Sequence, residues 1–162
     1  MIVHPIPPVI PDEPKLLILG SFPSVKSREA AFFYGHPQNR FWRVTAAILG
    51  EEVPKTTEEK RGMLIKHGIA LWDVIASCEI EGSADSSIRE AVPNDLSPIL
   101  GKNPEMSIHT NGKTAYDLYR KLIFPKTEKP AILLPSTSPA NAAFSLEKLV
   151  RIWSETLNLS NK

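Results

Sequence analysis

The segment FYGHPQNRFW, residues 33–42, gathers side chains whose types and spacing suit recognition of a planar, polar ligand. It holds four aromatic rings, two amides and an arginine, with a glycine and a proline between them. Aromatic faces stack on planar groups, and amides hydrogen-bond to the edges of such groups. Regular helices and strands are seldom built from this mixture, because glycine and proline mark turns. The segment therefore predicts either one wall of a pocket for a ligand such as a nucleobase or an apolar loop.

Composition places this segment in a globular chain. The 162 residues fit one domain, residues 1–162, with a sizeable core, and 42% of them are hydrophobic. The formal net charge is +1, so no general basic field points to nucleic acid, although a local patch could still bind it. The one cysteine, Cys78, excludes an internal disulfide, a four-cysteine zinc site and a cysteine-ligated iron–sulfur cluster. It favours a reducing compartment, and we expect a cytoplasmic protein of a prokaryotic cytosol.

Two further patterns argue against a metal centre and a membrane anchor. The histidines, His4, His36, His67 and His109, are scattered without ligand-like spacing, which predicts no metal site. The opening stretch MIVHPIPPVIPDEP has prolines that forbid a helix, so we expect residues 1–14 to form an extended arm and not a signal peptide. No apolar run is long enough to cross a membrane.

Short apolar runs alternate with amphipathic segments along the chain. The runs predict buried strands at residues 15–20, 69–75, 106–110 and 131–135. Helices are predicted at residues 40–49, 56–68, 111–124 and 145–157. A capping box from Thr56 to Glu59 opens the second helix, and Asn111 is a candidate cap of the third. Residues 76–104 are predicted to be mostly loop, with a short helix around residues 87–91.

This alternation predicts an α/β fold, a three-layer α/β/α arrangement around a central, mainly parallel sheet of four strands. Parallel sheets bind ligands outside the carboxyl ends of their strands. The strand ends in this chain are polar or rich in glycine and proline: GSFPS, WDVIASC, HTNGK and LPSTSPAN. The sequence therefore predicts a ligand site where these segments meet.

HPQNRFW, residues 36–42, resembles the HPxNRFW block of the mismatch-specific uracil/thymine-DNA glycosylases. GSFPS resembles the first motif of the deoxyinosine (hypoxanthine-DNA) glycosylase branch, and both groups belong to the uracil-DNA glycosylase superfamily. The resemblance continues through ALWDVIASCEIEGSADSSI, TNGKTAYDLY and LPSTSPANA. It covers the chain from residue 16 to about residue 142, in the expected order.

The resemblance implies a uracil-DNA glycosylase-like fold and a DNA repair enzyme. Such an enzyme flips a deaminated base out of DNA, here hypoxanthine from deoxyinosine, and hydrolyses its N-glycosidic bond, leaving an abasic site. The implied partner is DNA containing deaminated bases, with abasic-site repair enzymes downstream, and no cofactor or metal is implied. We expect a monomer. No lysine nucleophile is evident, so we also expect monofunctional action without strand cleavage.

Two departures from the uracil-processing motifs change the expected catalytic residue. Phe22 stands where uracil glycosylases carry a water-activating Asp, and Leu134 stands where a His or Asn usually holds a base carbonyl. In the deoxyinosine branch the catalytic amide lies in the Pro-x-Asn element, which implies that Asn39 positions the water. The alternative for Asn39 is an N-cap of the helix that begins at Arg40, and the two roles can coexist.

A first set of residues is expected to bind the base: Gly20, Ser21, Phe22, Pro23, Tyr34 and Asp73. Tyr34 would stack on the base, and the carboxylate of Asp73 could accept a hydrogen bond from N1–H of hypoxanthine. The alternative for Asp73 is a structural carboxylate bonded to loop amides. His36 could be a general acid, but we favour a loop-anchoring role. The remaining aromatic residues nearby are expected in the core: Phe32, Phe33, Phe41 and Trp42.

A second set is expected to hold DNA: Lys26, Arg40, Asn111, Lys113, Ser136, Thr137, Ser138, Pro139, Ala140 and Asn141, with Arg28 and Arg43 near the same edge. The basic side chains could bind backbone phosphates, and Asn111 opens a helix whose N–H groups could meet a phosphate. The STSPAN loop could touch phosphates and push into the duplex. Scattered surface charge and ordinary turns are the alternatives.

Three other functions stay open at this point. The nearest is an enzyme of the same class that acts on uracil or xanthine. A second is a catalytically silent DNA-binding module, because the usual Asp and His are missing. A third is a small serine hydrolase using Ser21 or Ser24, which is disfavoured because the chain has no GxSxG elbow.

Overall fold

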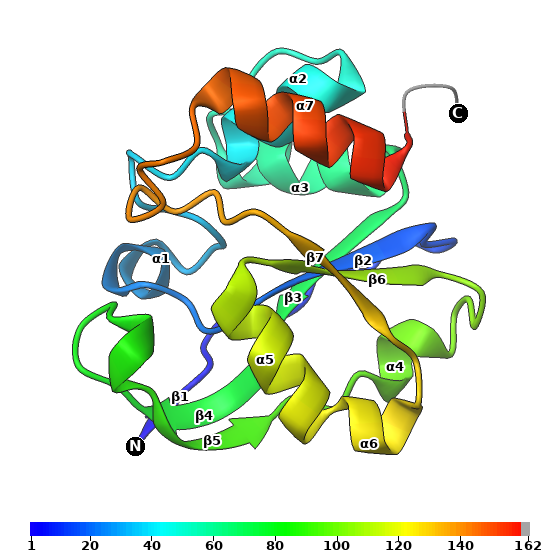
Figure 1. Cartoon of the computed structure of the whole chain (residues 1–162). Coiled ribbons are helices and arrows are strands. Elements are labelled where there is room, and N and C mark those ends of the chain that lie inside the picture. The colour runs from blue at the N-terminus through cyan, green and yellow to red at the C-terminus, as the bar shows by residue number, and fades with distance from the viewer. Residues whose placement is uncertain (160–162) are drawn as a thin grey trace.

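The computed structural model describes residues 1–159, and its centre is a parallel sheet of four strands (Figure 1). The strand order is β3 (Ile69–Asp73), β2 (Leu16–Gly20), β6 (Ser107–Asn111) and β7 (Ala131–Leu134). All three neighbouring pairs are parallel, so the carboxyl ends of the strands meet at one edge. The predicted central sheet is confirmed.

Both faces of this sheet are covered, because successive residues of a strand belong to different apolar clusters. In β2, Leu16 and Ile18 pack into one cluster, and Leu17 and Leu19 pack into the other. Three helices cover the first face (Figure 1): α2 (Phe41–Leu49), α3 (Thr57–Lys66) and α7 (Leu146–Leu157). Three others belong to the opposite side: α4 (Ser97–Leu100), α5 (Lys113–Leu122) and α6 (Phe124–Thr127). The predicted three-layer arrangement is therefore confirmed.

A second sheet, antiparallel and three-stranded, was not predicted. Its order is β1 (Ile2–Val3), β4 (Ile75–Glu79) and β5 (Arg89–Pro93). The single strand predicted over residues 69–75 is divided, since β3 ends at Asp73 and β4 begins at Ile75. The predicted helix around residues 87–91 is wrong, because a short 3-10 turn, Asp85–Ser87, leads directly into β5.

The second sheet could not be predicted from the sequence, and the reason is physical. None of the side chains in β5 is fully buried, and the β4–β5 register shifts between Ile75 and Ser77 and again between Ser77 and Glu79. Irregular registers break the alternation of polar and apolar residues by which a strand is recognised. The other partner of β4 is β1, which lies at the start of the chain and so is distant from β4 in sequence. No local sequence pattern therefore predicts that β4 pairs with β1 and β5.

The N-terminal arm is extended, as predicted, but it is part of the fold and not an appendage. Val9 and Leu71 exchange backbone hydrogen bonds of 2.9 and 3.0 Å along the free edge of β3. Ile6 and Val9 are buried in the core. This pairing fixes the first residues of the chain beside the carboxyl end of β3.

One predicted helix cap is confirmed, one is wrong, and one helix was not predicted. The capping box is confirmed, because the Thr56 hydroxyl accepts from the N–H of Glu59 and the Glu59 carboxylate accepts from the N–H of Thr56. Asn111 is not a cap: it is the last residue of β6, and Gly112, with a φ of 98°, caps α5. Helix α1 (Val25–Ala30) was not predicted, and it begins after a short polar turn at Ser24.

Within residues 1–159, no helix is both long and apolar enough to span a bilayer. In the same part of the chain, no group of three or more His, Cys, Asp and Glu residues could hold a metal ion.

Candidate active site

A cavity of about 320 Å³ lies at the carboxyl edge of the parallel sheet, where the sequence predicted a ligand site. Its walls come from the ends of the four parallel strands, from the loop before α2 and from the β4–β5 loop. The volume falls within the roughly 300–1,000 Å³ of small-molecule sites. The expected catalytic and base-binding residues all line it: Gly20, Ser21, Phe22, Pro23, Tyr34, Asn39 and Asp73.

The expected DNA-contacting residues divide into two groups. Those on the cavity wall are Asn111, Ser136, Thr137, Ser138, Pro139 and Ala140. Those away from the wall are Lys26, Arg40, Lys113 and Asn141. His36 also lines the cavity, and its Nδ1 accepts the N–H of Gln38 at 3.1 Å, as a loop-anchoring histidine would.

The side-chain oxygen of Asn39 faces the protein, and its amide nitrogen is left for the cavity. Oδ1 accepts the N–H of Phe41 at 2.9 Å and the hydroxyl of Thr137 at 2.8 Å. A backbone N–H can only donate, so turning the amide over would lose the bond to Phe41. Arg40 is the N-cap of α2 and Phe41 its first residue, so Asn39 holds the first N–H of that helix from the turn before it and still offers its nitrogen to a ligand.

Thr137 ties Asn39 to the end of β6. Its side chain is fully buried, and its hydroxyl accepts from Asn111 Nδ2 at 2.9 Å while donating to Asn39. The N–H of Thr137 donates to Asn111 Oδ1 at 3.0 Å. Both side chains of this pair are engaged within the protein, so their structural role is to position Asn39. Sequence reasoning missed this role, although two polar residues at neighbouring strand ends were a usable signal.

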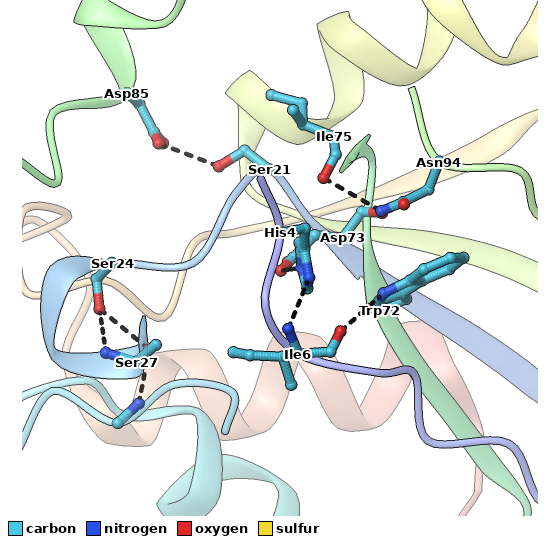
Figure 2. A network of polar contacts seen from close by, with 11 residues as sticks. His4, Ile6, Ser21, Ser24, Ser27, Trp72, Asp73, Ile75, Asp85 and Asn94 are labelled. Atoms are coloured by element: carbon cyan, nitrogen blue, oxygen red, sulfur yellow. Dashed lines mark hydrogen bonds and ion pairs between the residues drawn. The ribbon is translucent and has the colours of Figure 1, made fainter. Parts of the chain in front are cut away.

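Asp73 is held by a histidine from the N-terminal arm (Figure 2). Asp73 is only 3% exposed, and its Oδ2 lies 2.7 Å from His4 Nε2. The N–H of Ile6 donates to His4 Nδ1 at 3.2 Å, so Nδ1 acts as an acceptor and the ring proton sits on Nε2. His4 therefore donates to Asp73, and the alternative of a carboxylate bonded to loop amides is corrected.

Sequence reasoning missed His4, because the arm was taken only as an extended segment. The ring lies among three aromatic neighbours, with centroid distances of 5.8 Å to Phe22, 6.1 Å to Phe33 and 6.2 Å to Trp72. Trp72 Nε1 donates to the carbonyl of Ile6 at 3.2 Å and so anchors the arm (Figure 2). The available signal was one imidazole within an otherwise apolar, proline-rich stretch.

The backbone around Asp73 is fixed by a buried amide. Asn94 Nδ2 donates to the carbonyls of Asp73 at 2.9 Å and Ile75 at 3.1 Å, at the point where β3 gives way to β4 (Figure 2). The N–H of Val74 donates to the carbonyl of Gly20 at 2.7 Å. These bonds prevent the strand end from turning and keep the Asp73 carboxylate at the cavity.

One face of the Tyr34 ring is already occupied by the protein. The ring stacks on Phe41 with centroids 4.1 Å apart and planes 18° from parallel, so only the opposite face is left for a base. The backbone of Tyr34 has a φ of 54°, a left-handed conformation. Burial raises the pKa of the Tyr34 hydroxyl, and the charge of Asp73 adds to this effect, so the phenol stays protonated.

A second carboxyl group, which the sequence did not single out, bounds the cavity. The Ser21 hydroxyl donates to Asp85 Oδ1 at 3.0 Å (Figure 2). Loss of hydration at the wall raises the pKa of the Asp85 carboxyl, with a further contribution from the charge of Asp73, although the residue as a whole is exposed. The carboxyl groups of Asp73 and Asp85 both offer acceptor oxygens. The cavity therefore suits a ligand whose edge carries N–H groups better than it suits a free anion.

The two departures from the uracil-processing motifs persist in three dimensions. Phe22 lines the cavity with its ring, so no polar side chain stands at that position. Leu134 is fully buried in the core, and its carbonyl accepts from the N–H of Gly112 at 2.9 Å. Asn39 is thus the polar side chain that can take over the positioning of a water.

Arg40 is engaged within the protein, and its expected contact with the DNA backbone stays a prediction. Its guanidinium donates to the carbonyls of Thr137, Phe144, Ser138 and Asn141. Most of its N–H groups are therefore used inside the protein. The side chain therefore holds the loop after β7, part of which lines the cavity.

We expect Arg40→Met to lower the free energy of unfolding by about 2 kcal/mol, because charge-assisted hydrogen bonds to several carbonyls are lost. The salt dependence of DNA binding should stay unchanged if these internal bonds leave Arg40 no phosphate contact. Thermal unfolding and a salt titration of binding measure the two quantities. If the slope of the logarithm of the binding constant against the logarithm of the salt concentration became smaller by about one unit, with stability unaltered, Arg40 would be shown to contact a phosphate.

Two exposed lysines stay candidates for DNA contact. Lys26 lies 3.9 Å from Glu29, and Lys113 donates to Asp117 at 2.7 Å, each pair on one helix. Exposed pairs of this kind are weak, so a phosphate could replace the acid. Lys26→Met is the matched comparison for Arg40→Met, because it removes one exposed charge and no hydrogen bond to the loop after β7.

A cavity of this size at the carboxyl edge of an α/β/α sheet, with an amide and a buried carboxylate on its wall, suits an enzyme that takes in a single base. The family model of the uracil DNA glycosylase superfamily matches residues 7–157. The chain belongs to this superfamily, which confirms the expected class of enzyme, a DNA N-glycosylase.

Two relatives agree with the branch that GSFPS indicated, and a solved structure agrees with the fold. A hypoxanthine DNA glycosylase of Methanosarcina acetivorans is 37% identical over 90% of this chain and 92% of its own length. One of Methanosarcina barkeri is 34% identical over 92% of this chain and 94% of its own length. The solution NMR structure of a candidate uracil DNA glycosylase from M. acetivorans is 32% identical, with a TM-score of 0.78, covering 96% of this chain and 98% of that one. The resemblance and the fold are thereby confirmed.

Proposed function

We propose that this protein is a monofunctional hypoxanthine DNA glycosylase, which hydrolyses the N-glycosidic bond of deoxyinosine in DNA and leaves an abasic site. The observation that carries the proposal is one cavity that combines the amide nitrogen of Asn39, the carboxylate of Asp73 and the apolar ring of Phe22. The two curated relatives are named for the same activity. The product would pass to abasic-site repair enzymes, and we propose that the protein acts as a monomer.

Entry of the base is the first step. An inosine pair is weaker than a normal pair, so extrusion of its base costs less than the few kcal/mol otherwise needed. The free face of Tyr34 can stack on the base, because only its other face packs on Phe41. The flipped nucleotide would pass the wall formed by residues 136–140, whose side chains are short.

Recognition of the base edge follows from the buried carboxylate. Hypoxanthine carries N1–H beside its 6-oxygen, whereas adenine carries an unprotonated N1 beside an amino group. An ionised Asp73 accepts a hydrogen bond from N1–H and repels the lone pair of adenine N1. His4 occupies Oδ2, so Oδ1 is the oxygen offered to the base.

Cleavage needs a water beneath the sugar carbon and stabilisation of the departing base. An amide is too weak a base to deprotonate water, so Asn39 acts by positioning. Its oxygen is occupied by Phe41 and Thr137, so the water would accept a hydrogen bond from Nδ2. Negative charge on the leaving base spreads over the hypoxanthine lactam, which is why it leaves more readily than adenine. Within residues 1–159 no lysine lines the cavity, so we expect the strand to stay uncut.

The test is a panel of duplexes carrying inosine, uracil, xanthine or an ethenobase in one sequence context. We expect hypoxanthine to be released at least about tenfold faster than uracil in single-turnover reactions, because the polar groups usual for uracil are absent at Phe22 and Leu134. Equal rates on inosine and uracil would overturn the preference. Binding without release of any base would instead show a silent DNA-binding module.

A further inference from the structure

His4 comes from the start of the chain, yet its ionisable partner is a carboxylate on the cavity wall, 69 residues away in sequence. Both side chains are almost fully buried, with 3% of His4 and 5% of Asp73 exposed. Burial of such a pair is costly, and it is often no more stabilising than an apolar pair of the same size. A gain in folding stability is therefore a weak explanation for the pairing of His4 with Asp73.

The pair is also oriented from both sides. The N–H of Ile6 fixes the His4 tautomer that donates to Asp73, and Trp72 anchors Ile6 in turn (Figure 2). A Cβ on Gly20 would lie 2.5 Å from Asp73 Oδ1, so β2 leaves room for this oxygen only because residue 20 is glycine. One carboxylate oxygen is thus taken by the arm, and the other is kept at the wall.

We propose that His4 is a specificity-determining positioning residue, which holds Asp73 as an acceptor with Oδ1 aimed at the N–H of the flipped base. The N-terminal arm then forms part of the base-recognition site. This inference rests on the proposed function, in which Asp73 reads N1–H of hypoxanthine.

The chemistry explains why a donor is needed behind Asp73. A buried carboxylate without a partner tends to take up a proton, and a protonated carboxyl can present its own hydrogen to the base. Such a hydrogen would meet N1–H of hypoxanthine as a clash and would suit N1 of adenine. His4 Nε2–H places a donor on Oδ2, so the carboxylate meets the base as an acceptor and favours the deaminated base over its parent.

The experiment uses the full chain and two variants of His4. His4→Leu removes the donor at similar volume, and His4→Gln retains an N–H near the place of Nε2. Binding is measured to duplexes containing a 2′-fluoro analogue of inosine, whose fluorine suppresses cleavage, and the same analogue of nebularine, a purine without the 6-oxygen and N1–H. We expect His4→Leu to weaken binding of the inosine duplex about tenfold and that of the nebularine duplex by less than about twofold, with most of the loss recovered in His4→Gln.

A double-mutant cycle with Asp73→Asn isolates the path of the effect. If His4 acts through Asp73, His4→Leu should have little further effect on inosine binding in the Asp73→Asn background. The double variant also has no unpaired charge, so it keeps the test usable where His4→Leu alone folds poorly. The matched control is His67→Leu, because His67 also lies 2.7 Å from a carboxylate, Glu51, but away from the cavity.

Equal losses on both duplexes, in step with the melting temperature and without rescue by Gln, would overturn the inference and leave His4 as a structural residue. Additive effects of the two substitutions would overturn it as well. The wild type in the same assays separates this result from a failure of the proposed function, since that failure would appear as no release of hypoxanthine from cleavable inosine DNA.

Discussion

Asn39→Ala is expected to release hypoxanthine from inosine-containing DNA about a hundredfold to a thousandfold more slowly than the wild type in single-turnover reactions. The amide nitrogen of Asn39 faces the cavity, and Phe22 offers no polar group that could replace it. Loss of the amide should leave the water without a fixed position, and proximity of this kind is worth orders of magnitude in rate. Binding to inosine DNA should change little.

The same substitution has a structural cost that must be separated from the loss of rate. An alanine methyl group cannot accept from the N–H of Phe41, and loss of such a helix cap costs about 1 kcal/mol. Thr56→Ala is the matched control, since it removes the cap of α3 far from the cavity. It should lower the melting temperature to a similar extent and leave the rate unchanged.

The Asn39→Asp variant tests which side-chain atom of residue 39 holds the water. The aspartate can keep one oxygen on Phe41 and Thr137, so its fold should resemble the wild type, but it replaces the donor Nδ2 with an acceptor. We expect at least about a tenfold loss of rate if the water is held by donation from Nδ2. A rate equal to or above that of the wild type would show that the outward atom accepts from the water. Wild-type rates in Asn39→Ala would reduce Asn39 to a cap.

Asp73→Ala is expected to slow hypoxanthine release by about tenfold to a hundredfold, the equivalent of roughly 1–3 kcal/mol for an unpaired N1–H. Asp73→Asn would lose less than Asp73→Ala only if its amide oxygen could still accept from the base. The structure adds a condition to this expectation, since the amide must also keep its place beside His4. If its nitrogen turned toward His4 Nε2–H, two donors would meet, so the oxygen should stay on His4 and the NH2 should face the base.

This orientation of the amide in Asp73→Asn leads to a further expected result. Asp73→Asn would then present a donor at the cavity, and it should bind an adenine-containing flipped nucleotide relatively better than the wild type does. Single-turnover rates on inosine, binding to adenine and inosine duplexes, and melting temperatures of both variants are the quantities to compare. Equal rates per folded molecule in all three proteins, with lowered melting temperatures in the variants, would show that Asp73 serves only the fold.

The residues that form the site were largely predictable, but their contacts were not. Asn39, Tyr34 and Asp73 were all selected from their place at strand ends or in FYGHPQNRFW, and all line the cavity. Arg40 was selected for its charge, yet its guanidinium is used on the carbonyls of the loop after β7. Charge in a sequence does not tell whether a side chain meets solvent or a buried carbonyl, because that depends on segments remote in the chain.

The sequence by itself determined the layered parallel sheet and the edge at which a ligand binds. Continuous apolar runs such as LLILG can only be buried on both faces, and such strands need helices on either side. Strand ends of a parallel sheet then meet at one edge whatever the details of packing. These properties are local or follow from periodicity, so a single sequence carries them.

Only the tertiary structure decided how that edge becomes a site. The second sheet joins β1 to β4 across most of the first half of the chain, and the same path carries His4 to Asp73. The orientation of the Asn39 amide depends on Thr137, 98 residues away. Hydrogen bonds between such distant residues leave no periodic trace in the sequence, because their geometry exists only after the sheet has brought the segments together.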